Sequence, residues 1–167
     1  MTSKSLDSLM QLSAPAELHV GSEIESKCWP VALSLLRVWR ESSGGRTAPK
    51  RNALSPADIS NALPLVTIFD VERDPFLLRC RLMGTAFSDA IGFDATGDVA
   101  GRLPMSKPII DRAKWIVDNV QPILMTALPL VWSPDKNYKT YDSLCLPFLG
   151  DAGEVDSIWY LNQFHIP

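Results

Sequence analysis

Arg79 and Arg81 are the residues of this sequence whose type and spacing point most directly to a chemical role. They lie two positions apart in the run 76–83, where apolar residues fill the alternate positions, so both are expected on one face of a β-strand. A guanidinium group is costly to bury unless it is paired. Three interpretations follow: a solvated face with ion pairs to Asp70 or Asp142, an outer-face contact with an anion or a partner protein, or a pocket arginine that binds a carboxylate.

The other face of the same strand gives a second candidate site. Leu78, Cys80 and Leu82 alternate with the arginines, and Trp115 lies beside the apolar face of a helix predicted over 107–120. Aromatic and small apolar side chains in this arrangement indicate either ordinary core packing or a ligand cavity. The candidate lining is Leu78, Cys80, Leu82, Trp115, Tyr141 and Cys145.

Patterns typical of catalysis and metal binding do not occur in the sequence. The two histidines, His19 and His165, have no serine or cysteine partner at motif spacing. The three cysteines, Cys28, Cys80 and Cys145, are widely spaced and match neither a zinc pattern nor a disulfide framework. We therefore predict no catalytic residue, no metal site and no enzyme activity, with the cysteines as small buried thiols.

Two glycine-containing pairs could be mistaken for a phosphate-binding loop. Gly84 and Thr85 follow a predicted strand and open a short helix, and a helix N-terminus can bind an anion. However, their spacing to Thr96 and Gly97 fits no nucleotide-binding fingerprint. We expect these glycines to serve turn geometry with positive φ.

Length and composition limit the function classes. The chain has 167 residues, 46% of them hydrophobic, and a formal net charge of −3, which is typical of one globular domain. A nucleic-acid-binding surface usually gives a basic stripe, so no nucleic-acid partner is expected. The sequence has neither an export signal nor an apolar run long enough to cross a membrane, so we expect a cytoplasmic protein with reduced thiols.

The elements that must position these residues follow from periodicity. A helix over 29–41 follows a weakly patterned arm, and the short run 55–58 begins with a Ser-Pro helix start. The remaining elements are strands at 65–71 and 76–83, helices at 85–91 and 107–120, and strands at 123–132, 138–148 and 155–165. This order predicts an α+β domain with one antiparallel sheet, residues 1–45 forming an arm and helix and residues 46–167 the domain.

Proline and apolar patterns predict the places of two strands in the sheet. Pro129 cannot donate a ladder hydrogen bond, which favours an edge position for the strand 123–132. Apolar residues on both faces of 155–165 favour a central strand covered on both sides.

The strings LRCRLMGT at 78–85 and GFDATG at 92–97, together with the element order, carry a family resemblance. From Trp29 onward the chain resembles the PAS_5 family, a PAS-like group common in alphaproteobacteria. The resemblance implies a five-stranded antiparallel sheet with helices on one face, its first strand beside its last, and an N-terminal helical extension. It also implies a ligand space between the helix 107–120 and the sheet, and dimerisation through the N-terminal helix.

We therefore expect a stand-alone sensory or regulatory domain that binds a small molecule, a partner protein or both, and signals through association, with a homodimer as one form. Removing residues 1–42 is expected to change the oligomeric state. The alternatives are a ligand-free interaction module and a small cup-shaped enzyme. Flavin and haem are not expected, because the Asn-Cys-Arg stretch of flavin-binding PAS domains is missing and the run 107–120 has no histidine. The ligand's identity stays open.

Overall fold

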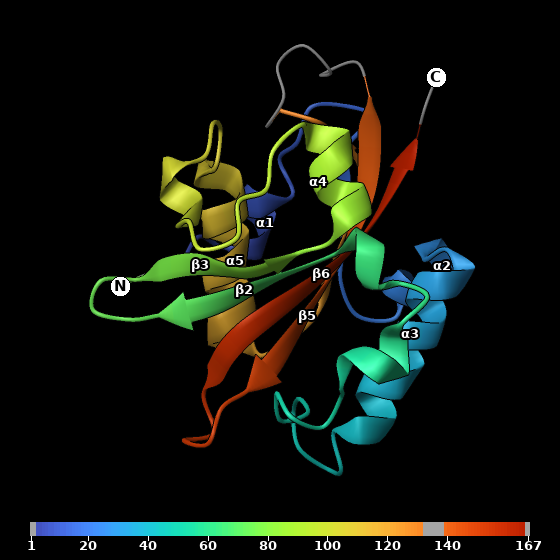
Figure 1. Cartoon of the computed structure of the whole chain (residues 1–167), viewed down its shortest axis with the longest axis vertical. Coiled ribbons are helices and arrows are strands. Elements are labelled where there is room, and N and C mark those ends of the chain that lie inside the picture. Colours follow the sequence, from blue (N-terminus) through green and yellow to red (C-terminus); the bar gives the residue numbers. More distant parts are fainter. Residues whose placement is uncertain (1–2, 132–138, 166–167) are drawn as a thin grey trace.

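The computed structural model describes residues 3–131 and 139–165. Its α-helices are α1 (Leu6–Leu9), α2 (Glu23–Lys27), α3 (Pro30–Ser42), α4 (Thr85–Ile91) and α5 (Lys107–Asn119), with short 3₁₀ helices η1 (Pro56–Ile59), η2 (Leu63–Leu65) and η3 (Ala100–Arg102). Its strands are β1 (Glu17–His19), β2 (Val66–Glu72), β3 (Leu77–Met83), β4 (Ile123–Pro129), β5 (Thr140–Leu149) and β6 (Val155–His165). The predicted α+β class is confirmed (Figure 1).

One antiparallel sheet of six strands organises the described part of the chain, in the order β1-β4-β5-β6-β2-β3. β2 pairs with β6, so the first strand after the helical segment lies beside the last one, as the resemblance implied. The predicted count of five strands was wrong, because the arm adds β1 to the edge, pairing Glu17–His19 with β4. Three residues are too few to show a period of two, so periodicity could not find this strand.

The proline argument predicted that β4 is an edge strand. This prediction was wrong for part of the strand, because β4 lies between β1 and β5. β1 pairs with its first half, opposite Leu124, Met125 and Thr126. Pro129 lies beyond the end of β1 and pairs only with Thr140 of β5, so its missing N–H interrupts no ladder on the outer side. β6 does lie inside the sheet, and most of its residues are buried, which confirms the expected central position.

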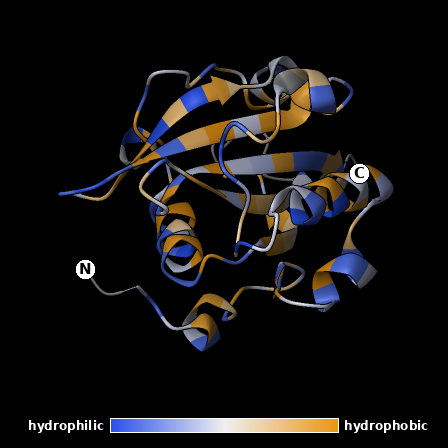
Figure 2. Ribbon diagram, turned by 90° about the horizontal axis from the view of Figure 1, so that it is seen from below, coloured by the Kyte–Doolittle hydropathy of each residue, from blue (hydrophilic) through white to orange (hydrophobic). Residues whose placement is uncertain are grey.

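α5 covers the inner face of the sheet. Pro108 stands in its first turn, where a missing N–H costs nothing, and Val120 ends it with a left-handed φ of 51°. Ile109, Ala113 and Ile116 repeat at helical spacing and are buried. Figure 1 shows α5 passing behind β2 and β3, and Figure 2 shows hydrophobic and hydrophilic residues alternating around the helices.

The outer face is covered as well, so the expectation of helices on one face was wrong. Trp39 of α3 is buried and donates its Nε1–H to the Pro147 carbonyl of β5 at 2.8 Å. Leu146 and Trp159 pair across β5 and β6 on the face away from α5 and are both buried. Figure 1 places α3 and α5 to either side of β5 and β6.

The segment expected as a separate arm and helix shares the core of the domain. Leu9, Leu18 and Leu36 lie in the same hydrophobic cluster as the sheet residues. The division at residue 45 stays a prediction, but buried side chains on both of its sides pack together.

A β-bulge in β3 changes the faces predicted for its residues. Phe69 pairs with Cys80 while Ile68 pairs with Leu82, so Arg81 is an extra residue without a partner in β2. Strict alternation is broken at this point. Met83 becomes the buried residue, whereas Leu82 shifts to the outer face and is only half-buried.

Candidate functional site

A small cavity lies between α5 and the inner face of the sheet. Its volume of about 20 Å³ is room for about one water molecule. Nine residues of β2, β4, β5 and β6 line it on the side of the sheet, and residues of α4 and α5 line the opposite side. The lining is Thr67, Phe69, Phe87, Ile109, Arg112, Met125, Leu128, Tyr141, Ser143, Cys145, Tyr160 and Asn162.

Two hydroxyl groups of this lining are buried without a hydrogen-bond partner among the described residues. They are Thr67 Oγ1 on β2 and the Tyr160 hydroxyl on β6, and the two residues are paired across the strands. A buried hydroxyl that makes no hydrogen bond costs about 1–3 kcal/mol. Such groups facing a cavity under an apolar helix are suited to bind a polar group that enters from outside.

Neighbouring contacts hold the polar lining in place. The Phe69 and Tyr160 rings meet edge to face with centroids 5.6 Å apart, which orients the tyrosine. Asn162 donates its Nδ2–H to the Leu65 carbonyl at 3.0 Å. Because these residues sit on hydrogen-bonded strands, the cavity floor is rigid and pre-formed.

Arg112 is the one charged residue among the described residues that line the cavity. It belongs to α5 and is half-buried, and its side chain makes no hydrogen bond or ion pair with another residue of 3–131 or 139–165. Its spacing from Ile109 and Ile116 places it on the helix side that faces the sheet. The cavity is therefore lined by a positive charge that forms no ion pair with an acidic residue of the described ranges.

A second pocket of about 220 Å³ lies against the first. Ile109, Arg112, Leu128 and Tyr141 line both spaces and so form the wall between them. The rest of the second pocket is mostly apolar. It is lined by Leu12, Ser13 and Ala16 of the arm, by Met105 and Pro108 before and within α5, and by Pro129 and Val131 after β4.

The titratable groups of the cavity stay protonated at neutral pH. Burial raises the pKa of the Cys145 thiol to about 11, an effect that the Arg112 charge and a hydrogen bond with Ser143 only partly oppose. Burial likewise raises the pKa of the Tyr141 and Tyr160 phenols above their ordinary value. These groups are therefore hydrogen-bonding groups of the cavity rather than nucleophiles or bases.

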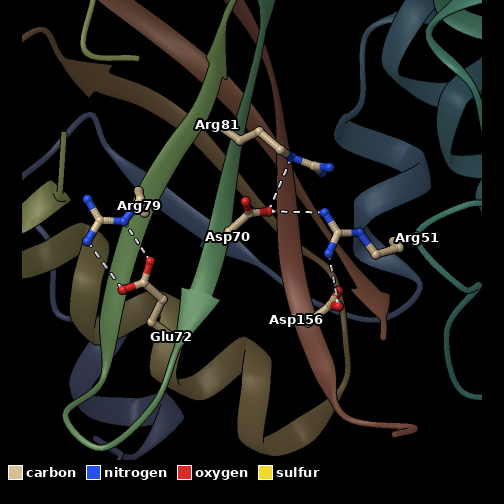
Figure 3. Close-up of polar contacts among 6 residues, drawn as sticks. All are labelled: Arg51, Asp70, Glu72, Arg79, Arg81 and Asp156. Atoms are coloured by element: carbon tan, nitrogen blue, oxygen red, sulfur yellow. Dashed lines mark hydrogen bonds and ion pairs between the residues drawn. The ribbon is translucent and has the colours of Figure 1, made fainter. Parts of the chain in front are cut away.

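Arg79 and Arg81 lie outside this cavity, on the outer side of the sheet (Figure 3). Arg79 binds Glu72 through Nε at 2.6 Å and through Nη2 at 3.3 Å. Arg81 Nε lies 3.2 Å from Asp70 Oδ1, and Arg51 bridges Asp70 and Asp156 at 3.5 and 3.2 Å.

These contacts match the interpretation of a solvated, ion-paired sheet face. Asp70 is the expected partner of Arg81, whereas Asp142 instead contacts His165 and the Ala127 N–H. All of these arginines are more than a third exposed, so each pair contributes little to stability. The paired state also leaves less charge free to attract an anion or an acidic partner.

Only part of the predicted pocket lies together. Tyr141 and Cys145 line the cavity. Leu78 and Cys80 are buried on the inner face of β3 but do not line it. Leu82 was assigned wrongly, because the bulge at Arg81 moves it to the outer face.

Trp115 is buried, but it does not line the cavity either. It lies four residues from Asp111, which places both on one side of α5, and Asp111 contacts Lys4 just before α1. This side of α5 therefore lies next to the arm.

The sequence reasoning missed Arg112, Thr67 and Tyr160. Arg112 was not singled out, although its spacing from Ile109 and Ile116 is that of the apolar face of the helix. A single charge inside an apolar helical stripe is the signal that pointed to it. Thr67 and Tyr160 look like ordinary strand residues, and only strand pairing brings the two residues side by side.

Other chemistry finds little support in the described ranges. No group of three His, Cys, Asp or Glu is placed there to hold a metal ion. Within the same ranges no helix combines the length and hydrophobicity needed to cross a membrane. Gly97 has the predicted positive φ, at 91°, but Gly84 does not.

Comparison with known proteins places most of the chain in one family. A family model described as PAS domain, PAS_5, matches residues 29–159, from the start of α3 into β6. No curated protein and no solved structure matches the chain.

Proposed function

The chain belongs to the PAS_5 family of PAS domains, and on this premise we propose a sensory or regulatory domain that binds a small molecule between α5 and the sheet. The observation that carries the proposal is the pair of buried hydroxyls, Thr67 Oγ1 and the Tyr160 OH, which face a cavity without a protein partner among the described residues. Core packing alone does not favour leaving polar groups in this state.

We further propose that the signal passes through association, as a homodimer or with a partner protein. α3 supports this step, because Val31 is 50% exposed and Val38 is 37% exposed, seven residues apart on one side of the helix. They line a shallow groove together with η1 and the residues up to Ala62. Large apolar side chains in water mark candidate contact surfaces.

The further parts of the proposal rest on composition and on the resemblance. A formal net charge of −3 gives no support for a nucleic-acid partner, and a cytoplasmic protein of bacterial origin is the setting we propose. No enzyme activity, metal or resident cofactor is proposed, since the buried Cys145 has a pKa of about 11 and the lining offers no base to activate it.

The test is native mass spectrometry of freshly purified protein, followed by denaturing extraction. A retained small molecule supports the sensor and gives its ligand a mass. Association is measured by light scattering on the wild type and on Val31→Ser/Val38→Ser, with Met10→Ser as a control in another exposed apolar residue. We expect the double variant alone to lose association; a wild type that is monomeric at every concentration contradicts the signalling step.

Removing residues 1–42 is no longer a useful test of association. The deletion takes Leu36 and Trp39 out of the core and uncovers the outer face of β5 and β6. We expect the shortened chain to unfold, which would hide any change of oligomeric state.

A ligand-free interaction module is the second candidate. The inner cavity of about 20 Å³ favours it, since small-molecule sites are usually several hundred Å³ in volume. A folded protein that retains no molecule in native mass spectrometry, yet still associates through α3, would establish this alternative.

A further inference from the structure

Arg112 gives the cavity a chemical preference. Its guanidinium is half-buried between two pockets and has no acidic partner among the described residues, whereas Arg51, Arg73, Arg79 and Arg81 all make ion pairs. A partly buried cation without a counter-ion is costly, so bringing an anion to it is favourable. None of the described residues that line either pocket is Asp or Glu.

The two pockets differ in polarity on either side of Arg112. The inner cavity offers hydrogen-bond donors, the Thr67 and Tyr160 hydroxyls. Outside the shared wall, the larger pocket of about 220 Å³ is lined mostly by aliphatic side chains and prolines. A ligand that fits both must have a small anionic head and a short apolar body.

We propose that this site binds a small aliphatic monocarboxylate, with its carboxylate at Arg112 and the Tyr160 hydroxyl and its chain in the outer pocket. The inference rests on the proposed function and names the ligand class for the same site. The arm helps to bind the chain, because Leu12 and Ala16 form one wall of the outer pocket.

Pocket composition argues against other anions. A dicarboxylate would place its second charge among Leu12, Met105 and Val131, and the described lining of this pocket has no cation besides Arg112. A phosphate group is commonly bound by several donors around a larger head, whereas the inner cavity has room for about one water-sized group, such as a single carboxylate oxygen. The monocarboxylate is therefore the class that the charge and the volume support best.

The test is isothermal titration calorimetry with butyrate and hexanoate on the full chain. Hexanol, of equal chain length without the charge, and succinate, with a second charge, are the comparison probes. Arg112→Gln and Tyr160→Phe remove the proposed contacts one at a time. Lys114→Gln is the matched control, because Lys114 lies on the same helix and faces the Phe76 ring at 5.7 Å, outside both pockets.

We expect hexanoate to bind more tightly than hexanol or succinate by at least about tenfold. Arg112→Gln should weaken the binding of hexanoate by about ten- to a hundredfold, which is the loss expected for a hydrogen bond to a charged group. Tyr160→Phe should weaken it by a smaller factor. Lys114→Gln should bind like the wild type. Circular dichroism spectra identify any variant that fails to fold, and the comparison of acid with alcohol on the wild type needs no variant.

Each contrary outcome has a separate meaning. Equal binding of hexanoate and hexanol, or no binding of either acid at millimolar concentration, overturns the carboxylate inference. The proposed sensor still stands if native mass spectrometry finds a retained molecule of another class. If neither acids nor a retained molecule bind, both fail and the interaction module takes their place.

Discussion

Gly84 is the position where the structure predicts the largest loss from one added methyl group. It ends β3 and precedes α4, and its N–H donates to the Val66 carbonyl at 2.7 Å. A Cβ at this position would lie within 3.0 Å of backbone atoms of Leu63 and Pro64, which no side-chain rotation can relieve. Gly84→Ala must therefore move η2 away from β3. We expect a loss of about 3 kcal/mol or more in the free energy of unfolding.

Substitutions at two other glycines distinguish the effect of steric crowding on stability from the effect of backbone conformation. Gly97 has open space but a φ of 91°, so Gly97→Ala should cost about 1–3 kcal/mol through strain alone. Gly101 has neither a close neighbour nor a positive φ, and Gly101→Ala should stay within about 0.5 kcal/mol of the wild type.

Urea denaturation followed by circular dichroism measures all three variants. For a chain of this length, about 3 kcal/mol corresponds to a fall in Tm of about 6–12 °C, which a thermal scan detects easily. If Gly84→Ala were as stable as Gly101→Ala, η2 would not pack on β3 as described, and the reasoning from close approach would be refuted.

Three further predictions follow from single contacts. Trp39→Phe removes the indole donor to the β5 carbonyl and should cost about 1–3 kcal/mol in urea unfolding; an unchanged midpoint would show that α3 is not docked there. Thr126→Val removes a hydrogen bond to the buried His19, whereas the hydroxyl that Thr67→Val removes has no described partner. Thr126→Val should therefore lower the free energy of unfolding by about 1 kcal/mol more than Thr67→Val does; equal losses would contradict this. Burial acts to raise the pKa of Asp111, but hydrogen bonds from two lysines outweigh it and hold that pKa below 3.8. The carboxylate therefore stabilises the fold above about pH 4 and loses this effect as the pH falls through its folded pKa. Asp111→Asn should be less stable than the wild type at pH 7. The difference in the free energy of unfolding, measured by urea titration, should become smaller as the pH falls toward 3. A difference that does not change with pH would refute the ion-pair argument.

The order of the elements could be predicted because each long element carries its own period. α3, α5 and the five longer strands repeat at helical or strand spacing over seven or more residues, and their bounds lie within a few residues of the expected ones. The start at Ser55 also follows the expected chemistry, since Ser55 and Asp58 form a capping box, although the helix that follows is a 3₁₀ turn. Short elements such as β1 and α2 have no period to detect.

The side-chain faces of β3 could not be predicted from alternation, because a bulge leaves no mark in the pattern. Arg79, Arg81 and Leu82 fit a regular strand equally well until the pairing with β2 is known. One extra residue moved Leu82 out of the predicted pocket and brought Met83 in toward the core. Local pattern therefore predicts that a strand exists more securely than which way its residues point.

The site depended on a different kind of information, the meeting of residues far apart in the sequence. Thr67, Arg112 and Tyr160 come from β2, α5 and β6, and each has an ordinary structural interpretation by itself. Strand pairing places Thr67 beside Tyr160, and the crossing of α5 brings Arg112 to the lining of the same cavity. Arg79 and Arg81, which stand out in the sequence, are paired with Glu72 and Asp70. Arg112 does not stand out in the sequence, and its side chain has no ion pair among the described residues. What distinguishes Arg112 from Arg79 and Arg81 is that no described residue supplies it with a carboxylate partner, a property that becomes visible only when the fold has placed the acidic residues it describes.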